Sequence, residues 1–382
     1  MDLNEWLDEV QLIVCVGSGG VGKTTSAAAL GLWAAIRGRR VMVLTIDPAR
    51  RLANSLGLSQ FGNDETQIDI SSIDGVKGEL WAMMLDSRST FDYVIGKASP
   101  NDEVRDRILN SHIYRHMSDT FAGSQDYMAT EKLYDLVHSG RYDLVILDTP
   151  PVKNALDFLE SPGRLVNFLD DRVMKWYLMP YDPKIVFGRR LMVGTSAVVF
   201  RLLSYVFGRD FLEDLGVFFK DFQELYEGFR ERHDAVIELL RAPSTHFLTV
   251  CAPTESSIDV AAFFQEELRR RDLPRAGVVV NQVHECSGES HDAHSLLGKV
   301  AESLSSDLND SVKGSVLARL GMAHRRLHDL ARAEEGLIDK VRSVAAGGGF
   351  LRRVPRLEGQ VHDLQALHTV GKSIFLRPAE TL

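Results

Sequence analysis

The chain has 382 residues, 45% of them hydrophobic, which is enough for one large α/β domain or two modest ones with an apolar core. A formal net charge of -9 argues against a surface that binds nucleic acid non-specifically. Three cysteines without paired spacing, and no basic segment followed by an apolar one at the start, favour a cytoplasmic protein without a disulfide framework or a cysteine-based zinc site.

The first predicted element is a buried strand at residues 12–16, an unbroken apolar run in which Cys15 is expected to be simple core packing. A glycine-rich stretch follows and leads into an alanine-rich helix over residues 23–37. Further buried strands are expected at 41–46 and 144–147.

Two more apolar runs, at residues 247–250 and 276–280, flank a helix near 258–270. Cys251 ends the first of these runs and is also expected in the core. Strands that alternate with helices predict an α/β fold with a mostly parallel sheet, covered on both faces.

Two long stretches interrupt this alternation and show apolar residues at helical spacing without strand-like runs. We interpret them as a helical subdomain inserted into a nucleotide-binding core. We therefore expect one domain over residues 1–382, with a core of residues 8–80, 141–157 and 243–382 and a helical subdomain of residues 81–140 and 158–242.

Two apolar segments allow more than one interpretation. Residues 315–345 predict a long helix that ends at three glycines, 347–349. Residues 191–208 are apolar over about the length of a membrane helix, but Arg201 lies in their middle, so we expect no transmembrane span. The alternatives left open for 191–208 are a helix buried against its neighbours and an apolar surface that receives a partner.

The glycine-rich stretch satisfies the Gly-x4-Gly-Lys-Ser/Thr pattern of a phosphate-binding loop (P-loop), between a predicted strand and a predicted helix. Its backbone N–H groups and the helix N-terminus would hold the phosphates of a nucleotide. We expect Lys23 to contact the β- and γ-phosphates, Thr24 to bind Mg²⁺ and Thr25 to reach the α-phosphate. The alternative, without a binding role, is a glycine-rich turn with an exposed lysine. The expected binding residues are Gly17, Ser18, Gly19, Gly20, Val21, Gly22, Lys23, Thr24 and Thr25.

Asp47 and Asp148 each come directly after or at the end of a predicted strand, and a proline-containing turn follows each. Both should therefore emerge at the carboxyl edge of the sheet, where the P-loop lies. An aspartate at such a position can also simply cap a helix or form a turn. We assign Asp47, with Lys23, to catalysis, as the group that positions or deprotonates the attacking water, and Asp148 to Mg²⁺ through water.

The P-loop, Thr45-Ile46-Asp47-Pro48-Ala49 and Leu147-Asp148-Thr149-Pro150-Pro151 together resemble the deviant-Walker ATPases of the arsenical-pump and tail-anchored-protein-targeting family (ArsA-like ATPases). The resemblance implies that Asn281 recognises adenine and that Pro355 lies in a loop on the adenine side. It also implies a P-loop NTPase fold, ATP as the nucleotide, and a dimer whose subunits open and close as ATP is hydrolysed.

The chain departs from this family at three points. The family's P-loop carries a signature lysine directly after its first glycine, where this chain has Ser18. Neither the clustered cysteines that bind arsenite nor the Cys-x-x-Cys pair that binds zinc is present. The lone Cys286, beside His284 and Glu285, is expected to be a surface thiol rather than a metal ligand.

Three functions compete. The first is an ATPase, a dimer with itself or with an ArsA-like homologue, whose switching gates a hydrophobic segment or partner protein through aromatic-rich helices between about residues 174 and 229. The second is a weakly hydrolysing regulatory or structural subunit, paired with a homologue that carries the signature lysine. The third, a partition-type ATPase on a membrane surface, would need a longer amphipathic terminal helix than residues 373–377 offer.

Overall fold

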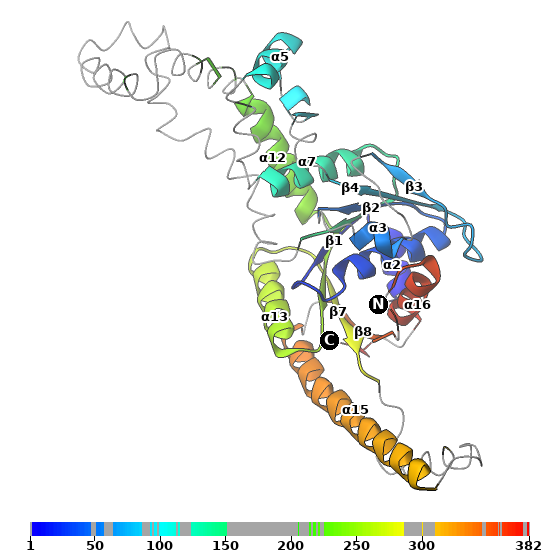
Figure 1. Ribbon diagram of the computed structural model, residues 1–382. Coiled ribbons are helices and arrows are strands. Elements are labelled where there is room, and N and C mark those ends of the chain that lie inside the picture. The colour runs from blue at the N-terminus through cyan, green and yellow to red at the C-terminus, as the bar shows by residue number, and fades with distance from the viewer. Residues whose placement is uncertain are drawn as a thin grey trace, which may run out of the picture.

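The computed structural model describes residues 2–46, 51–56, 64–85, 92–111 except 94 and 98, 114, 124–150, 205, 214, 217–218, 221, 225–285, 300, 310–345, 349–376 except 358 and 360, and 380–381. A central sheet with helices on both faces forms the body of the molecule (Figure 1). The helices α5 (Asp102–Asn110) and α15 (Asp310–Ala345) lie at opposite ends of it.

The sheet has nine strands among the described residues, in the order β3-β4-β2-β5-β1-β6-β7-β8-β9. Only the two edge strands, β3 and β9, pair antiparallel with their neighbours. The predicted α/β class and mostly parallel sheet are therefore confirmed. The strands are β1 (Leu12–Val16), β2 (Arg40–Thr45), β3 (Thr66–Ile68), β4 (Glu79–Met84), β5 (Leu144–Asp148), β6 (Thr245–Cys251), β7 (Arg275–Val283), β8 (Phe350–Pro355) and β9 (Glu380–Thr381).

Side chains of alternate residues along each strand fill two separate apolar layers. In β1, Leu12 and Val14 pack with the helices of one face, whereas Ile13 and Cys15 pack with those of the other. The first layer is covered by α7 (Ser124–His138), α12 (Tyr226–Arg241) and α13 (Glu255–Arg270), and the second by α1 (Leu3–Glu9), α2 (Lys23–Ile36) and α16 (Leu364–Phe375).

The register of the central strands brings their carboxyl ends to one level. Asp148 of β5 lies opposite Cys15 of β1 and Thr45 of β2. β1 lies between β5 and β6, so the chain segments that leave these strands surround the start of α2. This is the edge at which open parallel sheets bind ligands.

A strand lies where the helical subdomain was predicted to begin, at residue 81. Residues Glu79–Met84 form β4, which pairs in parallel with β2, and its Leu80, Ala82 and Met83 are fully buried. Leucine, alanine and methionine are strong helix formers, and burial in the sheet overrides that local preference. The described residues farther along, in α5, α7 and α12, are helical as expected.

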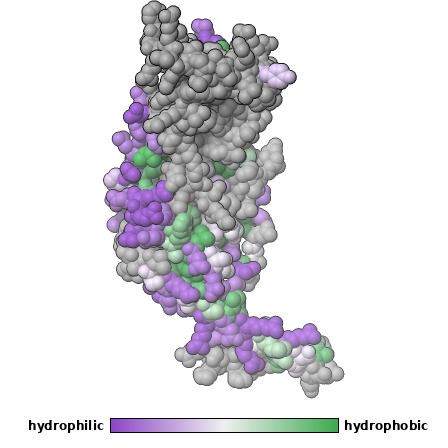
Figure 2. All heavy atoms as spheres, turned by 90° about the vertical axis from the view of Figure 1, so that its left-hand side faces the viewer, coloured by the Kyte–Doolittle hydropathy of each residue, from purple (hydrophilic) through white to green (hydrophobic). Residues whose placement is uncertain are grey.

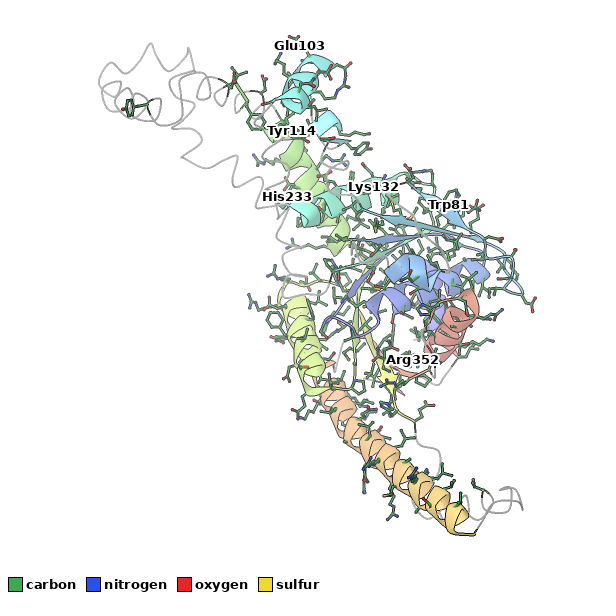
Figure 3. The ribbon with its side chains drawn as sticks, viewed as in Figure 1. Trp81, Glu103, Tyr114, Lys132, His233 and Arg352 are labelled. Atoms are coloured by element: carbon green, nitrogen blue, oxygen red, sulfur yellow. The ribbon has the colours of Figure 1, made fainter. Side chains whose placement is uncertain are left out.

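Ion pairs join the helices above the sheet. Arg232 of α12 donates to Glu131 and, at 2.8 Å, to Asp135, both on α7. Glu131 is only 1% exposed, and Arg232 offers its buried carboxylate an opposite charge. The neighbouring residues His233 and Lys132 mark where the two helices run side by side (Figure 3). The helices are therefore fixed to each other by buried charge as well as by apolar packing.

The long helix α15 has 36 residues and begins at Asp310, five residues before the predicted start. Its Ile338 and Val341 are buried against α13 and β7, whereas its first half projects from the body (Figure 1). Apolar and hydrophilic side chains both lie along this projecting end, at the bottom of Figure 2. Its exposed apolar residues are Val312, Leu320, Met322, Leu327 and Leu330.

The C-terminal part holds elements that the sequence did not predict. Residues 373–375 belong to α16, whose Leu367, Val370 and Ile374 are buried against α2, so they form core and not a surface tail. Among the described residues, no helix combines the length and the apolarity needed to cross a bilayer. Of the stretch 191–208, the described part of the chain includes Tyr205 alone.

Candidate nucleotide site

The P-loop connects β1 to α2, as predicted, and two of its glycines are required by their surroundings. Gly17 has φ +154°, and a Cβ atom there would lie 2.0 Å from the carbonyl oxygen of Val250. Gly22 has φ +90°, and a Cβ atom there would lie 2.1 Å from Nδ2 of Asn281. The backbone can therefore turn tightly into α2, whose first N–H groups face the loop in the arrangement that binds anions.

Lys23, the first residue of α2, folds its side chain back into the loop. Its ammonium group donates to the carbonyl oxygens of Gly17, at 3.0 Å, and Ser18, at 2.9 Å. The residue is only 6% exposed. The alternative of a glycine-rich turn with an exposed lysine is therefore wrong, because the charge of Lys23 lies inside the loop that would surround the phosphates.

Asp148, Thr24 and Thr45 form a buried polar cluster beside the loop. The hydroxyl groups of Thr24 and Thr45 donate to the same carboxylate oxygen of Asp148, at 2.7 and 3.0 Å. Asp148 is fully buried at the end of β5. Carboxylate and hydroxyl oxygens are the ligands that Mg²⁺ prefers, so this donor set fits the metal expected here.

Asp47, the predicted catalytic carboxylate, lies outside the described residues. The strand end that leads to it is described: the backbone N–H of Ile46 donates to the carbonyl of Asp148 at 3.2 Å. With the Thr45 contact, this bond fixes the end of β2 against Asp148. Thr45 was not predicted to have a role in the site.

The two described cysteines are buried in β1 and β6 and lie in the core, as predicted. Burial raises the pKa of the Cys251 thiol to about 12. Burial and the nearby charge of Asp148 raise the pKa of Cys15 still further above its usual range. Both thiols therefore stay protonated at neutral pH and act as apolar core groups. Cys286 lies outside the described residues.

Ser18, the residue directly after the first glycine of the P-loop, contacts the chain's own α13. Its hydroxyl oxygen lies 3.0 Å from that of Ser257. Ser257 also accepts a hydrogen bond from the backbone N–H of Ala252, at 3.0 Å. The P-loop is thereby linked to the segment between β6 and α13, a contact that sequence reasoning missed.

A cavity of about 860 Å³ opens beside Gly22 and Thr25. Asn281 and Pro355 both line it, so two residues predicted from weak motifs come together there. Asn281 is 8% exposed and donates from Nδ2 to the carbonyl of Val21 at 2.9 Å. Pro355 is the last residue of β8, and not part of a loop as expected, because β8 pairs with β7.

His284 lines this cavity and contacts Glu334, and neither residue was predicted as a site residue. Glu334 of α15 binds His284, which lines the cavity together with Glu285 and Arg356. One signal was present in the sequence: Glu334 interrupts the apolar stripe of α15 between Leu330 and Ile338, four residues from each. A charged residue at such a position indicates a buried partner.

A family model described as "Anion-transporting ATPase" matches residues 10–299. The match includes the P-loop, Asp148 and Asn281, and it ends before α15 and β8.

Three relatives show the range of similarity. ATPase GET3B of Arabidopsis thaliana is 24% identical over 285 residues, 70% of this chain and 62% of the relative. ATPase GET3 of Malassezia globosa is 30% identical over 165 residues, 43% and 46% of the two chains. An ATPase ASNA1 homolog of Trypanosoma cruzi is 24% identical over 298 residues, 72% and 75%. This chain thus spans less than two thirds of the first two relatives.

Proposed function

The chain belongs to the anion-transporting ATPase family, and on that premise we propose that it binds ATP with Mg²⁺ in the loop of residues 17–25 and hydrolyses it. One observation carries the proposal. The buried ammonium of Lys23 lies in the glycine-rich turn between β1 and α2, and Thr24 of the same turn binds Asp148 at the end of the neighbouring strand β5. Phosphoryl transfer needs positioning and electrostatic stabilisation, and this turn offers a fixed cation, backbone donors and oxygen ligands.

Each residue has a stated role in this proposal. Lys23 would bind the β- and γ-phosphates and neutralise charge that develops on them. Thr24 would hold Mg²⁺ directly, and Asp148 through water. The metal, when bound, supplies Lewis-acid stabilisation of the phosphoryl oxygens. Asp47 would orient or deprotonate the attacking water.

We further propose that the base of the nucleotide occupies the cavity beside Thr25. Asn281 offers an amide that can exchange its bond to Val21 for one to adenine. Pro355 supplies an apolar edge on which a ring can rest. An adenine base needs both a directional polar partner and flat apolar contact, and the cavity provides both.

The proposed activity is a switch in shape that accompanies hydrolysis, in a cytoplasmic dimer of this chain with itself or with a homologue. Support comes from the family and from the helical subdomain, which we expect to gate a hydrophobic segment or partner protein. Of residues 174–229, the structure describes only a few: Tyr205 is 91% exposed and Val217 54%, whereas Phe218 is buried. The two exposed side chains suit an apolar client surface.

The alternative is a regulatory or structural subunit that hydrolyses ATP slowly and pairs with a homologue that carries the signature lysine. The contact of Ser18 with Ser257 favours it. A short neutral side chain held by its own subunit cannot supply a charge to the nucleotide of a partner.

The direct test is Mg²⁺-dependent hydrolysis of ATP by the full chain. We expect release of phosphate with Mg²⁺ and none in excess EDTA. In Asp148→Asn the Mg²⁺ concentration for half-maximal activity should rise about tenfold, because a neutral amide holds the water shell of the metal less tightly. A parent chain that binds no ATP at all contradicts the proposed function, and an unchanged Mg²⁺ requirement moves the metal role away from Asp148.

A second prediction separates the two oligomeric alternatives. If the missing signature lysine limits hydrolysis, Ser18→Lys should restore the charge that one copy offers to the nucleotide of the other. The turnover of the purified homodimer should then rise by about 10³-fold or more. Ser18→Ala is the control, because it breaks the contact with Ser257 without adding charge. A search for a co-purifying homologue in the native host tests directly for the heterodimer. Fast hydrolysis by the unmodified homodimer, unaffected by Ser18→Lys, would show that no lysine-bearing partner is needed.

A further inference from the structure

One carboxylate of α15 makes two hydrogen bonds to a single residue at the cavity wall. The backbone N–H of His284 donates to Oε2 of Glu334 at 2.8 Å, and the ring Nδ1 lies 2.6 Å from Oε1. Glu334 is 4% exposed and the side chain of His284 20%. Both oxygens of a buried charge thus hold the segment that follows β7.

The Glu334 contact also decides what His284 presents to the cavity. The ring Nδ1 of His284 lies 2.6 Å from Oε1 of Glu334, and this contact fixes the orientation of the ring. Nε2 is then the atom directed away from Glu334, and the guanidinium of Arg356 lies 3.5 Å from it. His284 and Arg356 line the same cavity as Asn281. Glu334 therefore orients a ring that stands between α15 and the proposed base site.

Another residue of α15 lines the cavity itself. Leu327, seven residues before Glu334 and hence about two helical turns away, contributes to the lining. Ile338 and Val341 anchor the following turns of the helix in the apolar cluster with α13 and β7. Glu334 therefore lies along α15 between Leu327, which lines the cavity, and the residues that anchor the helix in the core.

We infer that Glu334 is a positioning residue for the base end of the nucleotide, acting through His284. This inference rests on the proposed function, because it assigns the cavity to the nucleoside part of ATP. Glu334 holds the segment of residues 281–285, which carries Asn281, at the distance that the base requires. The phosphates bind at the P-loop and do not depend on this contact.

The competing explanation is that Glu334 only attaches α15 to the body. The chain offers a matched control for it, since the next residue, Glu335, also pairs with the sheet. Glu335 accepts two hydrogen bonds from Arg353 of β8, at 2.6 and 2.8 Å, but neither residue lines the cavity. If Glu334 only attaches α15, substitution of either glutamate should weaken ATP binding to a similar degree. If Glu334 positions the base site, only its own substitution should weaken ATP binding.

The experiment compares two ligands in the full chain with Mg²⁺: ATP, and inorganic tripolyphosphate, which lacks the nucleoside. Glu334→Gln should weaken ATP binding about tenfold, the loss expected when a hydrogen bond to a charged group is removed. Tripolyphosphate affinity should stay within about twofold of the parent. Glu335→Gln should leave both affinities within the same limits. His284→Ala should reproduce the ATP loss, and adding Glu334→Gln to it should cost clearly less than Glu334→Gln costs in the parent, because only the bond from the backbone N–H of residue 284 remains to be weakened.

Several outcomes overturn the inference. Equal losses for ATP and tripolyphosphate, equal losses in Glu334→Gln and Glu335→Gln, or additive losses in the double variant would each assign Glu334 to attachment. ATP affinity unchanged in Glu334→Gln would do the same. If Glu334→Gln does not fold, as judged by circular dichroism, His284→Ala decides with the same pair of ligands. A parent that does not bind ATP, with or without binding of tripolyphosphate, contradicts the proposed function, whereas a parent that binds ATP and variants that show any of the outcomes above contradict this inference alone.

Discussion

Lys23→Ala is expected to weaken ATP binding by about two to three orders of magnitude. The ammonium of Lys23 lies in the P-loop, within hydrogen-bond distance of the carbonyl oxygens of Gly17 and Ser18. Truncating one partner of a buried, hydrogen-bonded charge pair costs about 2–5 kcal/mol, and every 1.4 kcal/mol is a factor of ten in affinity. Binding should fall because the phosphates lose the cation that the loop holds for them.

The measurement is the dissociation constant of ATP with Mg²⁺, by calorimetry or with a fluorescent nucleotide. Lys372→Ala is the control, because Lys372 is exposed on α16 away from the loop. The fold should survive Lys23→Ala, since two hydrogen bonds to loop carbonyls contribute only about 1 kcal/mol each. A Lys23→Ala chain that keeps its thermal transition and the ATP affinity of the parent would remove the phosphate-loop assignment.

The sequence predicted the centre of the sheet well, because each central strand is an unbroken apolar run that needs no context. The apolar runs of β1, β5 and β6 predict strands that are buried on both faces, and the structure confirms this. β4 was missed because its leucine, alanine and methionines favour helix locally, and only pairing with β2 makes them a strand. α16 was missed for a related reason: its apolar face has meaning only against α2.

The site also contains residues that a local sequence pattern predicts and residues that only the fold brings together. The P-loop is contiguous in sequence, so its glycines, Lys23 and Thr24 could be predicted from spacing alone. The contacts of Ser18 with Ser257 and of His284 with Glu334 join residues 239 and 50 positions apart. No local pattern encodes such pairs, because the sheet topology brings them together. Asn281 and Pro355 were suggested by resemblance, and their common cavity is a structural observation.

Asp47→Asn should have the opposite signature to Lys23→Ala: hydrolysis falls while ATP affinity stays within a few-fold. The prediction rests on the described end of β2. Thr45 and Ile46 are bonded to Asp148, in the cluster expected to hold Mg²⁺, and Asp47 is the next residue in the sequence. A carboxylate there would act on the attacking water and not on the bound nucleotide. Removing a general base costs about 10²- to 10⁴-fold in rate, and the amide introduced by this substitution cannot accept a proton from water.

The test measures single-turnover hydrolysis and ATP affinity on the same preparation of Asp47→Asn. Asp143→Asn is the matched control, because Asp143 pairs with Arg40 just before β5, at the opposite edge of the sheet. Asp143→Asn should hydrolyse ATP at the parent rate, since that carboxylate is a whole strand length from the loop. If Asp47→Asn also keeps the parent rate, another group activates the water. If it loses affinity together with rate, Asp47 contributes to binding the metal and its nucleotide, and the division of labour with Asp148 must be reversed.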